Sequence, residues 1–429
     1  MSGDTIAAVA TAMTASGIGI VRISGDDARK ILKRVFRPKD SKKDMAAVTS
    51  HTIHYGYIYD GDEMVDEVLV MLMDGPRSYT GENTVEIDCH GGVLAMRKVL
   101  ETALKNGARI SEPGEFTKRA FLNGRIDLSQ AEAVGDIISA KSEYALQSSI
   151  SQLKGNVQKS IKVIREKLIY QIAFIESALD DPEHISIDGY SKELKGIVEI
   201  EKQRIKKLID SADEGKMIRE GIKTVIVGKP NVGKSSLLNI LIGEDRAIVT
   251  DVAGTTRDVL EEMIILQGIS LRMMDTAGIR QTTDIVEQIG VEKTRENVKN
   301  ADLILYVVDA SIPLDENDEE ILSMIKEEKK KAIVLLNKTD LTTVVTEGEV
   351  QKKCSFAIIP ISAKEELGIE TLEKQMKEMF FSGEVSFNDE VYITNMRHKE
   401  ALVEAYQSLE MVEDSIKQEI GRASCRERV

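Results

Sequence analysis

Hydrophobic and polar positions follow three different patterns along the chain, and the first covers residues 1–120. There, short stretches rich in Val, Ile, Leu and Met alternate with stretches whose apolar residues recur at helical spacing. The strand-like stretches are residues 17–23, 64–73 and 84–88, and the helical ones are residues 26–36 and 93–106. This mixture predicts an α+β unit.

The second pattern, from about residue 128 to 220, is helical throughout. One predicted face carries Ala131, Val134, Ile137 and Ile138, and another carries Ile161, Ile164, Leu168 and Ile172. The same spacing returns after about residue 382, with Ala401, Ala405, Leu409 and Val412 on one face. Long amphipathic helices bury such faces against one another. We therefore expect a helical bundle built from two separated segments.

The third pattern lies between these segments, where short apolar runs alternate with helical stretches. The runs are residues 224–227, 269–274, 303–308, 332–336 and 357–361. This alternation is typical of a mostly parallel sheet wrapped by helices. The chain is thus predicted to be multidomain, with an α+β N-terminal domain (1–120), an α-helical bundle domain (121–220 and 381–429) and an inserted α/β domain (221–380).

Composition narrows the classes of protein to consider. A length of 429 residues exceeds what one core usually supports, so two to four domains are expected. The net charge of −15 argues against nucleic-acid binding by the whole surface but leaves room for a local basic patch. The start of the chain is unlike a signal peptide, and no apolar run approaches the ~20 residues that span a bilayer. We expect a cytoplasmic protein without a membrane segment.

The three cysteines, Cys89, Cys354 and Cys425, are far apart and show no metal-ligand spacing. They are interpreted as two small core residues and one in a tail.

The clearest chemical motif begins at Gly228 and reads GKPNVGKS. It fits the phosphate-loop pattern without a mismatch, directly after a predicted strand and before a predicted helix. Glycines let the backbone N–H groups point at phosphate oxygens, and the helix N-terminus adds positive potential. Lys234 is expected to contact the β- and γ-phosphates, and the Ser235 hydroxyl to bind Mg²⁺.

The choice of base is indicated by the segment Asn337-Lys338-Thr339-Asp340 at the end of another predicted strand. A carboxylate at Asp340 can accept two hydrogen bonds from the N–H edge of guanine, and adenine presents no such pair. A site built on these bonds rejects the wrong base strongly, because its polar groups are left unpaired. Ser362 and Ala363 follow the next strand and are expected to back the base. The sequence therefore predicts GTP as the nucleotide.

Two further segments complete the expected site. The D-x-x-G segment at 275–278 ends a strand, where a carboxylate can hold Mg²⁺ through water. Thr256, in the loop ahead of it, is the expected second Mg²⁺ hydroxyl, although a plain surface turn is the alternative reading of residues 254–257. The expected GTP-binding residues are Asn231, Val232, Gly233, Lys234, Ser235, Ser236, Thr250, Asp251, Val252, Ala253, Gly254, Thr255, Thr256, Asp275, Thr276, Ala277, Gly278, Asn337, Lys338, Asp340, Ser362 and Ala363.

The group that orients the attacking water must differ from that of small GTPases. Those proteins usually place a Gln directly after D-x-x-G, and this chain has Ile279 there. Glu287 is the candidate for the role; otherwise it reads as an ordinary helix-surface residue.

With these motifs placed, the whole chain up to about residue 418 closely resembles the MnmE (TrmE) family of tRNA-modifying GTPases. Segments outside the GTPase domain carry the resemblance: GIVRISG (19–25), YTGEN (79–83), HGG (90–92), PGEFTKRAFLNG (113–124) and LSQAEA (128–133). The resemblance implies a folate-binding N-terminal domain that forms a homodimer, and a GTPase domain inserted into a split helical domain. It also implies an FAD-dependent partner of the MnmG (GidA) type.

By the same resemblance, the two proteins add an aminomethyl or carboxymethylaminomethyl group at C5 of the wobble uridine of certain tRNAs. A tetrahydrofolate derivative, of the 5-formyl or 5,10-methylene type, would supply the one-carbon unit. Arg22, Glu86 and Arg125 match folate-contacting positions of the family; taken alone, each reads more simply as a structural salt-bridge residue.

The resemblance further implies activation of the GTPase by K⁺, in place of an arginine finger, where two GTPase domains meet. Asn231, Thr250, Val252 and Thr255 match its ligand positions, and Glu287 matches the residue that positions the water. Together with Lys234 and Thr256, Glu287 forms the expected catalytic set.

The last residues, 421–429, depart from the family pattern. Relatives continue past position 418 and finish in Cys-x-Gly-Lys, so this end is interpreted as a truncation with a foreign or frame-shifted tail, and Cys425 is not equated with the family cysteine. The helix from about residue 396 is then expected to expose apolar surface. Two rival hypotheses stay open: a GTP-dependent switch in ribosome assembly or signalling, and a GTPase that has lost the modification activity.

Overall fold

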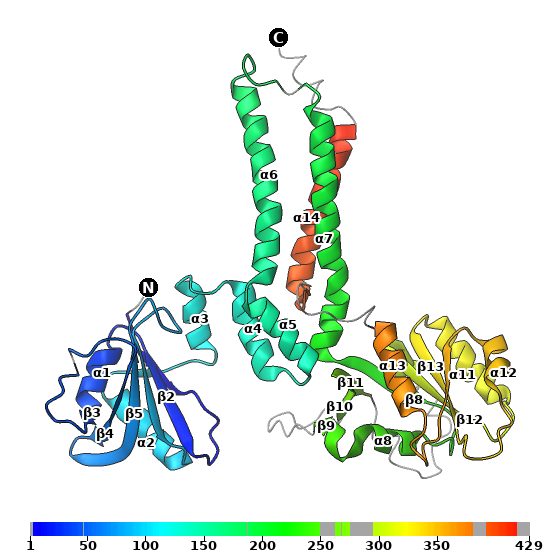
Figure 1. Ribbon diagram of the computed structural model, residues 1–429, viewed down its shortest axis with the longest axis horizontal. Coiled ribbons are helices and arrows are strands. Elements are labelled where there is room, and N and C mark those ends of the chain that lie inside the picture. Colours follow the sequence, from blue (N-terminus) through cyan, green and yellow to red (C-terminus); the bar gives the residue numbers. More distant parts are fainter. Residues whose placement is uncertain are drawn as a thin grey trace. The chain divides into compact units, whose positions relative to one another are not determined.

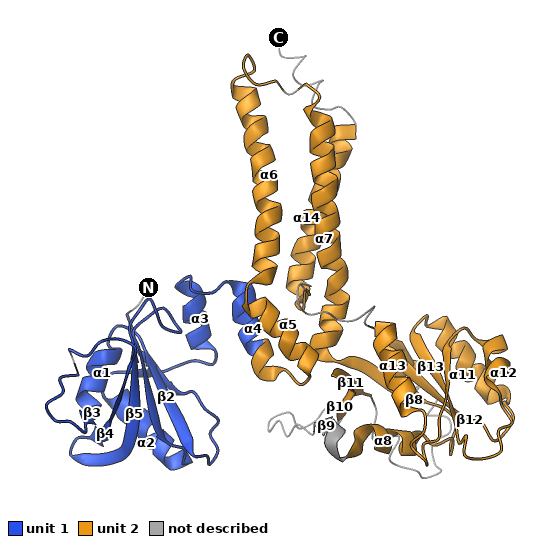
Figure 2. Cartoon of the chain, in the orientation of Figure 1, with its two compact units in different colours: residues 1–135 blue, residues 136–429 orange. Residues whose placement is uncertain are grey.

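The computed structural model describes residues 3–45, 47–186, 188–248, 262–266, 268–274, 295–380 and 392–417. The chain forms two compact units, residues 1–135 and 136–429 (Figure 2).

The first unit is built on a seven-stranded sheet in the order β3-β4-β5-β6-β2-β1-β7. All neighbours are antiparallel except β1 and β7, which are parallel. Its strands are β1 (Ile6–Val9), β2 (Ile18–Ser24), β3 (Phe36–Pro38), β4 (Thr52–Asp60), β5 (Glu63–Met73), β6 (Thr84–His90) and β7 (Arg109–Ile110). The three predicted strands are confirmed as β2, β5 and β6, and β4 was not singled out by the sequence pattern.

Helices α1 (Ala28–Val35) and α2 (Val93–Lys105) provide the apolar cover of this sheet, and both confirm predicted helices. Ile31 and Leu32 of α1 and Met96 and Val99 of α2 are buried in one core with apolar residues of β2, β4, β5 and β6. Cys89 lies in the same core, as expected for a small apolar residue. Helix α3 (Glu115–Leu122) follows β7.

The second unit begins with helices. Helix α4 (Leu128–Ser139) crosses the boundary of the units, and α5 (Glu143–Leu153), α6 (Asn156–Asp180), α7 (Tyr190–Glu220) and α14 (Met396–Lys417) follow (Figure 1). Helices α7 and α14, far apart in sequence, lie side by side and bury Ile205, Leu402 and Leu409. Lys202 Nζ of α7 also lies 2.6 Å from Glu413 Oε2 of α14. The predicted packing of two separated helical segments is confirmed here.

The predicted helical faces were wrong in detail on three helices. On α4, Ile138 is 81% exposed, and the buried side chains are Ser129, Ala133 and Asp136. On α6, Ile164 is buried but Ile161 and Ile172 are exposed, because the buried stripe of this helix runs through Val157, Ile164, Gln171 and Ala178 and lies beside the predicted face. On α14, Leu409 is buried, but Ala401, Ala405 and Val412 of the predicted face are exposed, and the other buried residue is Leu402. The exposed Met411 and Val412 agree with the apolar surface expected on this helix.

The rest of the second unit is a seven-stranded sheet in the order β14-β13-β12-β8-β11-β10-β9, in which β14 to β11 are parallel and β10 and β9 antiparallel. Its strands are β8 (Ile222–Val227), β9 (Ala247–Ile248), β10 (Glu262–Leu266), β11 (Ile269–Met273), β12 (Leu303–Asp309), β13 (Lys331–Asn337) and β14 (Ala357–Pro360). All five predicted strands are confirmed within one residue at each end, apart from the first, which begins two residues earlier.

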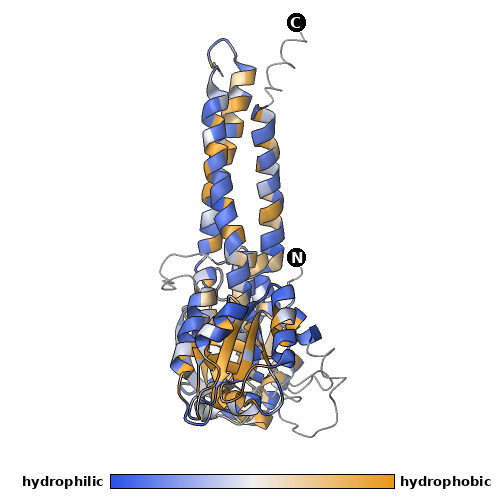
Figure 3. Cartoon of the chain, turned by 90° about the vertical axis from the view of Figure 1, so that its right-hand side faces the viewer, coloured by the Kyte–Doolittle hydropathy of each residue, from blue (hydrophilic) through white to orange (hydrophobic). Residues whose placement is uncertain are grey.

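Helices cover both faces of this sheet. Helices α8 (Lys234–Arg246) and α13 (Ile369–Phe380) bury leucines such as Leu237 and Leu372 against one face. Helices α11 (Glu316–Glu327) and α12 (Glu347–Lys353) cover the other with Leu322 and Val350. The strands are the hydrophobic layer between them (Figure 3). Gly221 lies between α7 and β8, where the hydrophobic pattern changes. In the described residues we find no helix of the length and hydropathy that a bilayer span requires.

Candidate functional site

The phosphate-loop motif lies between β8 and α8, as predicted. Gly228 and Gly233 have φ angles of 149° and 101°, in the region that favours glycine. A Cβ at Gly233 would lie 2.1 Å from the Asn337 side-chain nitrogen, and one at Gly228 would lie 2.4 Å from the Val307 carbonyl. Asn231 adopts the left-handed region as well, with φ 62°. The turn therefore needs glycine at both ends, for its dihedral angles and for space.

Lys234, the first residue of α8, is held over this loop. Its Nζ donates to the carbonyls of Gly228 (2.7 Å) and Lys229 (2.6 Å). Burial lowers the pKa of this amine, because the charged form loses hydration. Ser235 and Ser236 follow in the first turn of α8. An anion at the helix N-terminus would offset the lost hydration, which fits the predicted phosphate contact.

Lys229 ties the loop to α11. Its Nζ donates to Asp315 Oδ2 (2.8 Å) and to Asp318 Oδ2 (2.7 Å), and the other Asp318 oxygen accepts from the Tyr306 hydroxyl (2.8 Å). Asp318 and Tyr306 are fully buried. Burial would lower the pKa of Lys229, but the two carboxylates raise it. The loop's second residue is thus anchored by a buried charged network.

Asn337 joins the phosphate loop to the segment after β14. Its side-chain amide donates to the Val232 carbonyl (2.8 Å), and its Oδ1 accepts from the Ala363 backbone N–H (2.9 Å). Asn337 and Val232 are each 2% exposed. The first residue of the N-K-x-D segment therefore aligns three separate segments.

Asp340 presents its carboxylate at the surface beside this junction. The Ser362 hydroxyl donates to Asp340 Oδ1 (2.7 Å), and this bond lowers the pKa of the carboxyl. Lys338 donates to Asp309 Oδ2 (2.6 Å). Burial would raise the pKa of Asp309, but Lys338 and Ser311 lower it. An ionised, oriented carboxylate can accept both N–H groups of a guanine edge.

The structure therefore brings together Asn231, Val232, Gly233, Lys234, Ser235, Ser236, Asn337, Lys338, Asp340, Ser362 and Ala363 along the carboxyl ends of β8, β13 and β14. The remaining expected residues, Thr250, Asp251, Val252, Ala253, Gly254, Thr255, Thr256, Asp275, Thr276, Ala277, Gly278 and Glu287, lie outside the described residues, as do Ile279 and Cys425.

Three side chains that hold the segments of the site in place were not predicted from the sequence: Lys229, Asp309 and Asp318. Asp309 could have been found, because it is the polar last residue of an apolar strand and pairs in register with Asn337. Asp318 lies within a capping box, where an acid is expected for local reasons alone, so its contact with Lys229 left no signal.

A second polar cluster lies in the first unit and gathers the three expected folate residues. Arg22 Nε lies 2.6 Å from Glu86 Oε1, on paired strands β2 and β6. The Arg22 guanidinium also lies 5.0 Å from the centre of the Tyr79 ring and 5.5 Å from that of Phe116. Arg125 stacks on the same Tyr79 ring, at 4.9 Å. The salt bridge that is the simpler interpretation of Arg22 is thus present, and the Tyr79 ring contacts both Arg22 and Arg125.

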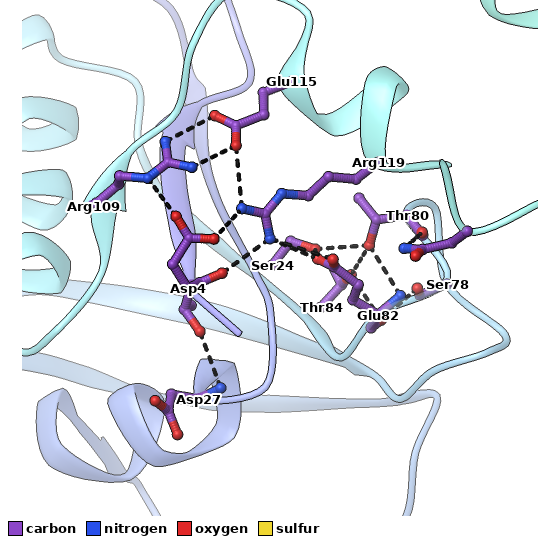
Figure 4. A network of polar contacts seen from close by, with 12 residues as sticks. Asp4, Ser24, Asp27, Ser78, Thr80, Glu82, Thr84, Arg109, Glu115 and Arg119 are labelled. Carbon is purple, nitrogen blue, oxygen red and sulfur yellow. Dashed lines mark hydrogen bonds and ion pairs between the residues drawn. The ribbon is translucent and has the colours of Figure 1, made fainter. Parts of the chain in front are cut away.

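A network of charged side chains fixes the segments that carry this cluster (Figure 4). Arg119 of α3 lies 3.1 Å from Glu82 and from Glu115, and 2.8 Å from Asp4. Arg109 holds the other side of Glu115, at 2.6 Å. The hydrogen bond from Arg109, above all, lowers the pKa of Glu115 to about 2. The network joins α3, which carries Phe116, to the loop that carries Tyr79.

This cluster can bind a flat ring and an anion at once. Guanidinium groups attract carboxylates, and aromatic faces stack on planar rings. Groups of three or more His, Cys, Asp or Glu suited to a metal ion do not occur in the described residues. The chemistry of this donor set fits a folate, which combines a ring with carboxylates.

A phosphate loop after the first strand of a parallel sheet, with N-K-x-D and S-A-K segments after later strands, defines a P-loop GTPase. Two family descriptions match the chain: the N-terminus of the GTP-binding protein TrmE, at residues 5–125, and the MnmE helical domain, at residues 128–426.

Curated relatives agree with these matches. The chain is 56% identical over 420 residues to a tRNA modification GTPase MnmE of Lachnoclostridium phytofermentans, covering 98% of this chain and 91% of the relative. It is 50% identical to that of Clostridioides difficile, covering 94% and 88%. The chain therefore belongs to the family of MnmE tRNA modification GTPases, and it binds and hydrolyses GTP. Family membership implies Mg²⁺ as well.

Among solved structures, Era of Aquifex aeolicus, described as bound to GDP and AlF₄⁻, is 32% identical. The match covers 42% of this chain and 64% of Era with a TM-score of 0.29, a likeness too weak to add to the assignment.

Proposed function

We propose that this chain is a K⁺-activated GTPase that acts in the cytoplasm, as a homodimer, with an FAD-dependent partner of the MnmG (GidA) type. Together they would add an aminomethyl or carboxymethylaminomethyl group at C5 of the wobble uridine of tRNA, with a tetrahydrofolate derivative as one-carbon source. The family, whose members are named tRNA modification GTPases, supports this proposal.

The observation that carries it is that one chain holds both a guanine-nucleotide site and the cluster of Arg22, Glu86 and Arg125. A switch in ribosome assembly or signalling requires the first site only. Folate binding would account for the cluster around Arg22, which a GTP-dependent switch leaves unexplained. We therefore favour the modification enzyme over the switch.

In this proposal, separate groups of residues bind the phosphates, select the base and orient the attacking water. Lys234 and the loop N–H groups hold the β- and γ-phosphates, and Asp340 selects guanine. Bound Mg²⁺, on Ser235 and Thr256, and K⁺, on Asn231, Thr250, Val252 and Thr255, would offset charge on the phosphates. Glu287 orients the attacking water, a role that Ile279 cannot fill.

GTP turnover with K⁺ and with Na⁺ tests the activation. We expect faster turnover in K⁺, and equal rates would remove K⁺ from the mechanism. Glu287→Ala should lower kcat by about three orders of magnitude while GTP still binds, since a lost proton-transfer or orienting group costs roughly 10²–10⁴-fold. Normal turnover of this variant would exclude Glu287.

Folate binding to the full chain tests the second site. Arg22→Leu should weaken 5-formyltetrahydrofolate at least about tenfold, because a charge-assisted contact contributes roughly 1.5–3 kcal/mol. Arg97→Leu, an exposed arginine of α2, is the matched control and should bind normally. Equal binding by both variants, measured by calorimetry, would disprove the assignment of Arg22.

A further inference from the structure

One segment of the first unit is strongly positive, although the chain as a whole is negative. Residues 29–43 carry eight Lys and Arg side chains and a single acid, Asp40, in a chain whose net charge is −15. They span α1, the edge strand β3 and the turn that follows. The Asp40 carboxylate accepts a hydrogen bond from the Lys42 backbone N–H at 3.1 Å.

Most of these cations are left without a counter-ion. Arg29 is paired with Asp74, Lys30 with Asp27, and Arg37 lies 3.8 Å from the fully exposed Asp62. In the described part of the chain, no ion pair joins the other five to a carboxylate, and all are exposed: Lys33, Arg34, Lys39, Lys42 and Lys43. Arg34 donates to the Asn106 carbonyl and Lys39 to the Tyr57 hydroxyl, and both of these partners are uncharged. Unpaired surface cations this dense repel one another, which an approaching anion would relieve.

Tyrosines lie next to these cations on the sheet. Tyr55, Tyr57 and Tyr59 alternate along β4 and so face the same side. Arg37 pairs in register with Tyr57, and the Lys39 N–H donates to the Tyr55 carbonyl at 3.0 Å.

The side chains of these residues are in contact. The Arg37 guanidinium lies 3.9 Å from the centre of the Tyr59 ring, and Lys39 Nζ lies 5.5 Å and 5.6 Å from the centres of Tyr57 and Tyr55. Tyr55 is 42% exposed. We name Arg37, Lys39, Lys42 and Lys43 with the three tyrosines the basic edge; β3 and β4 form this end of the sheet, beside α1 (Figure 1).

Cations interleaved with aromatic rings are what a nucleic-acid strand requires. Lysine and arginine contact phosphates, and tyrosine faces stack on bases that are not paired. Protection of an edge strand from aggregation explains Arg37, Pro38 and Lys39. It does not explain Lys42 and Lys43, which follow the strand, or the cations of α1.

A second copy of the chain fits this surface poorly. A two-fold interface places the same patch on both subunits face to face, so its unpaired cations would oppose their own copies. A polyanion has no such penalty. Among polyanions, RNA matches the tyrosines as well as the charge.

We propose that the basic edge binds the sugar–phosphate backbone of tRNA, with the tyrosines stacking on unpaired bases. This proposal rests on the proposed function, in which tRNA is the substrate. The surface would supply the binding that the acidic chain as a whole opposes.

The test is binding of a labelled tRNA transcript to the full chain at about 50 and 200 mM KCl. The triple variant Lys39→Glu, Lys42→Glu, Lys43→Glu should bind at least about 100-fold more weakly, and its salt dependence should fall by about three phosphate contacts. The matched control reverses three exposed lysines of the GTPase domain, Lys329, Lys352 and Lys374, and should bind normally. GTP turnover of both variants should match the unaltered chain.

Tyr55→Leu separates stacking from charge, whereas Tyr57 also accepts a hydrogen bond from Lys39 Nζ at 2.9 Å. Tyr55→Leu should weaken binding about tenfold without changing the salt dependence, because stacking contributes roughly 1–3 kcal/mol per base.

Equal affinity and salt dependence of the charge-reversed and control variants would overturn the basic edge but not the proposed function. Loss of dimerisation in the charge-reversed variant, with tRNA binding unchanged, would assign this surface to a second copy instead. No binding by the unaltered chain would overturn both proposals.

Discussion

The nucleotide site and the cluster around Arg22 are built in opposite ways. The nucleotide site consists of short continuous segments, each placed at the carboxyl end of a parallel strand, and its contacts use the backbone heavily. The Arg22 cluster joins side chains from β2, β6, a loop and α3, and it is held by ion pairs. The shape of the nucleotide site depends on the geometry of its backbone turns. The shape of the Arg22 cluster depends on ion pairs between side chains.

This difference predicts different failures. A change of charge in the nucleotide site should mainly alter which ligand binds, because the backbone that shapes the site remains. A change of charge in the N-terminal network should mainly alter stability, because the ion pairs are themselves the scaffold. The three predictions below test this contrast.

The largest effect is expected at Asp340. Asp340→Asn places an amide NH₂ where guanine also donates, so two charge-assisted hydrogen bonds are lost. At roughly 1.5–3 kcal/mol each, the affinity for GTP should fall about 1,000-fold. Xanthosine triphosphate presents a carbonyl in place of the guanine amino group, and it should bind the variant better than GTP does. Fluorescent-nucleotide titrations give both affinities.

Ser362→Ala is the control for Asp340, because it removes the hydroxyl that holds the carboxylate and leaves the charge. It should weaken GTP only about tenfold, and folate binding should be unaffected in both variants. A loss of folate binding on Asp340→Asn would contradict the independence of the two sites.

A smaller effect is expected at Lys229, where the nucleotide site does rely on buried charge. Lys229→Met leaves the Asp318 carboxylate buried without its cation, which should lower the free energy of unfolding by about 3 kcal/mol. GTP affinity should fall about tenfold, since the Lys229 carbonyl also receives Lys234.

Two control variants, Tyr306→Phe and Lys329→Met, set the scale for the loss of unfolding free energy in Lys229→Met. Burial raises the pKa of the Tyr306 phenol, so it stays protonated and donates to Asp318. Removing it should cost about 1–2 kcal/mol, and Lys329→Met, at an exposed lysine, almost nothing. If chemical denaturation gives Lys229→Met and Lys329→Met the same free energy of unfolding, the contact between Lys229 and Asp318 does not stabilise the fold.

The parts of the nucleotide site that could be predicted belong to motifs with a fixed spacing. Gly228 and Gly233 provide the positive φ angles of the phosphate loop, and Asn337 was found through the N-K-x-D segment although its contact with Val232 is a tertiary one. Lys229 and Asp318 are 89 positions apart and meet only through the fold. Local residue types cannot carry such a contact, and each of the two reads as an ordinary surface charge.

The same limit appears in the helices. Periodicity predicted that α6 would form and identified Ile164, but it could not tell which stripe of the helix is buried, since Gln171 is buried while Ile161 and Ile172 are exposed. Which stripe is buried depends on the neighbouring helices, a tertiary property. In the first unit, Arg22, Glu86 and Arg125 were found through family resemblance, whereas Tyr79 and Phe116 emerged from the structure.

The smallest effect concerns pH and the N-terminal network. Because the pKa of Glu115 is lowered from 4.5 to about 2, its ionised form stabilises the first unit, and the contribution is complete above pH 4.5. It is lost as the pH falls from about 4.5 to 2. Glu115→Gln should cost about 2 kcal/mol at pH 7, through its weakened bonds to Arg109 and Arg119. The variant should then lose less stability than the unaltered chain between pH 4.5 and 2. Parallel pH curves for the two proteins would mean that Asp4 and Glu82 alone balance the two arginines.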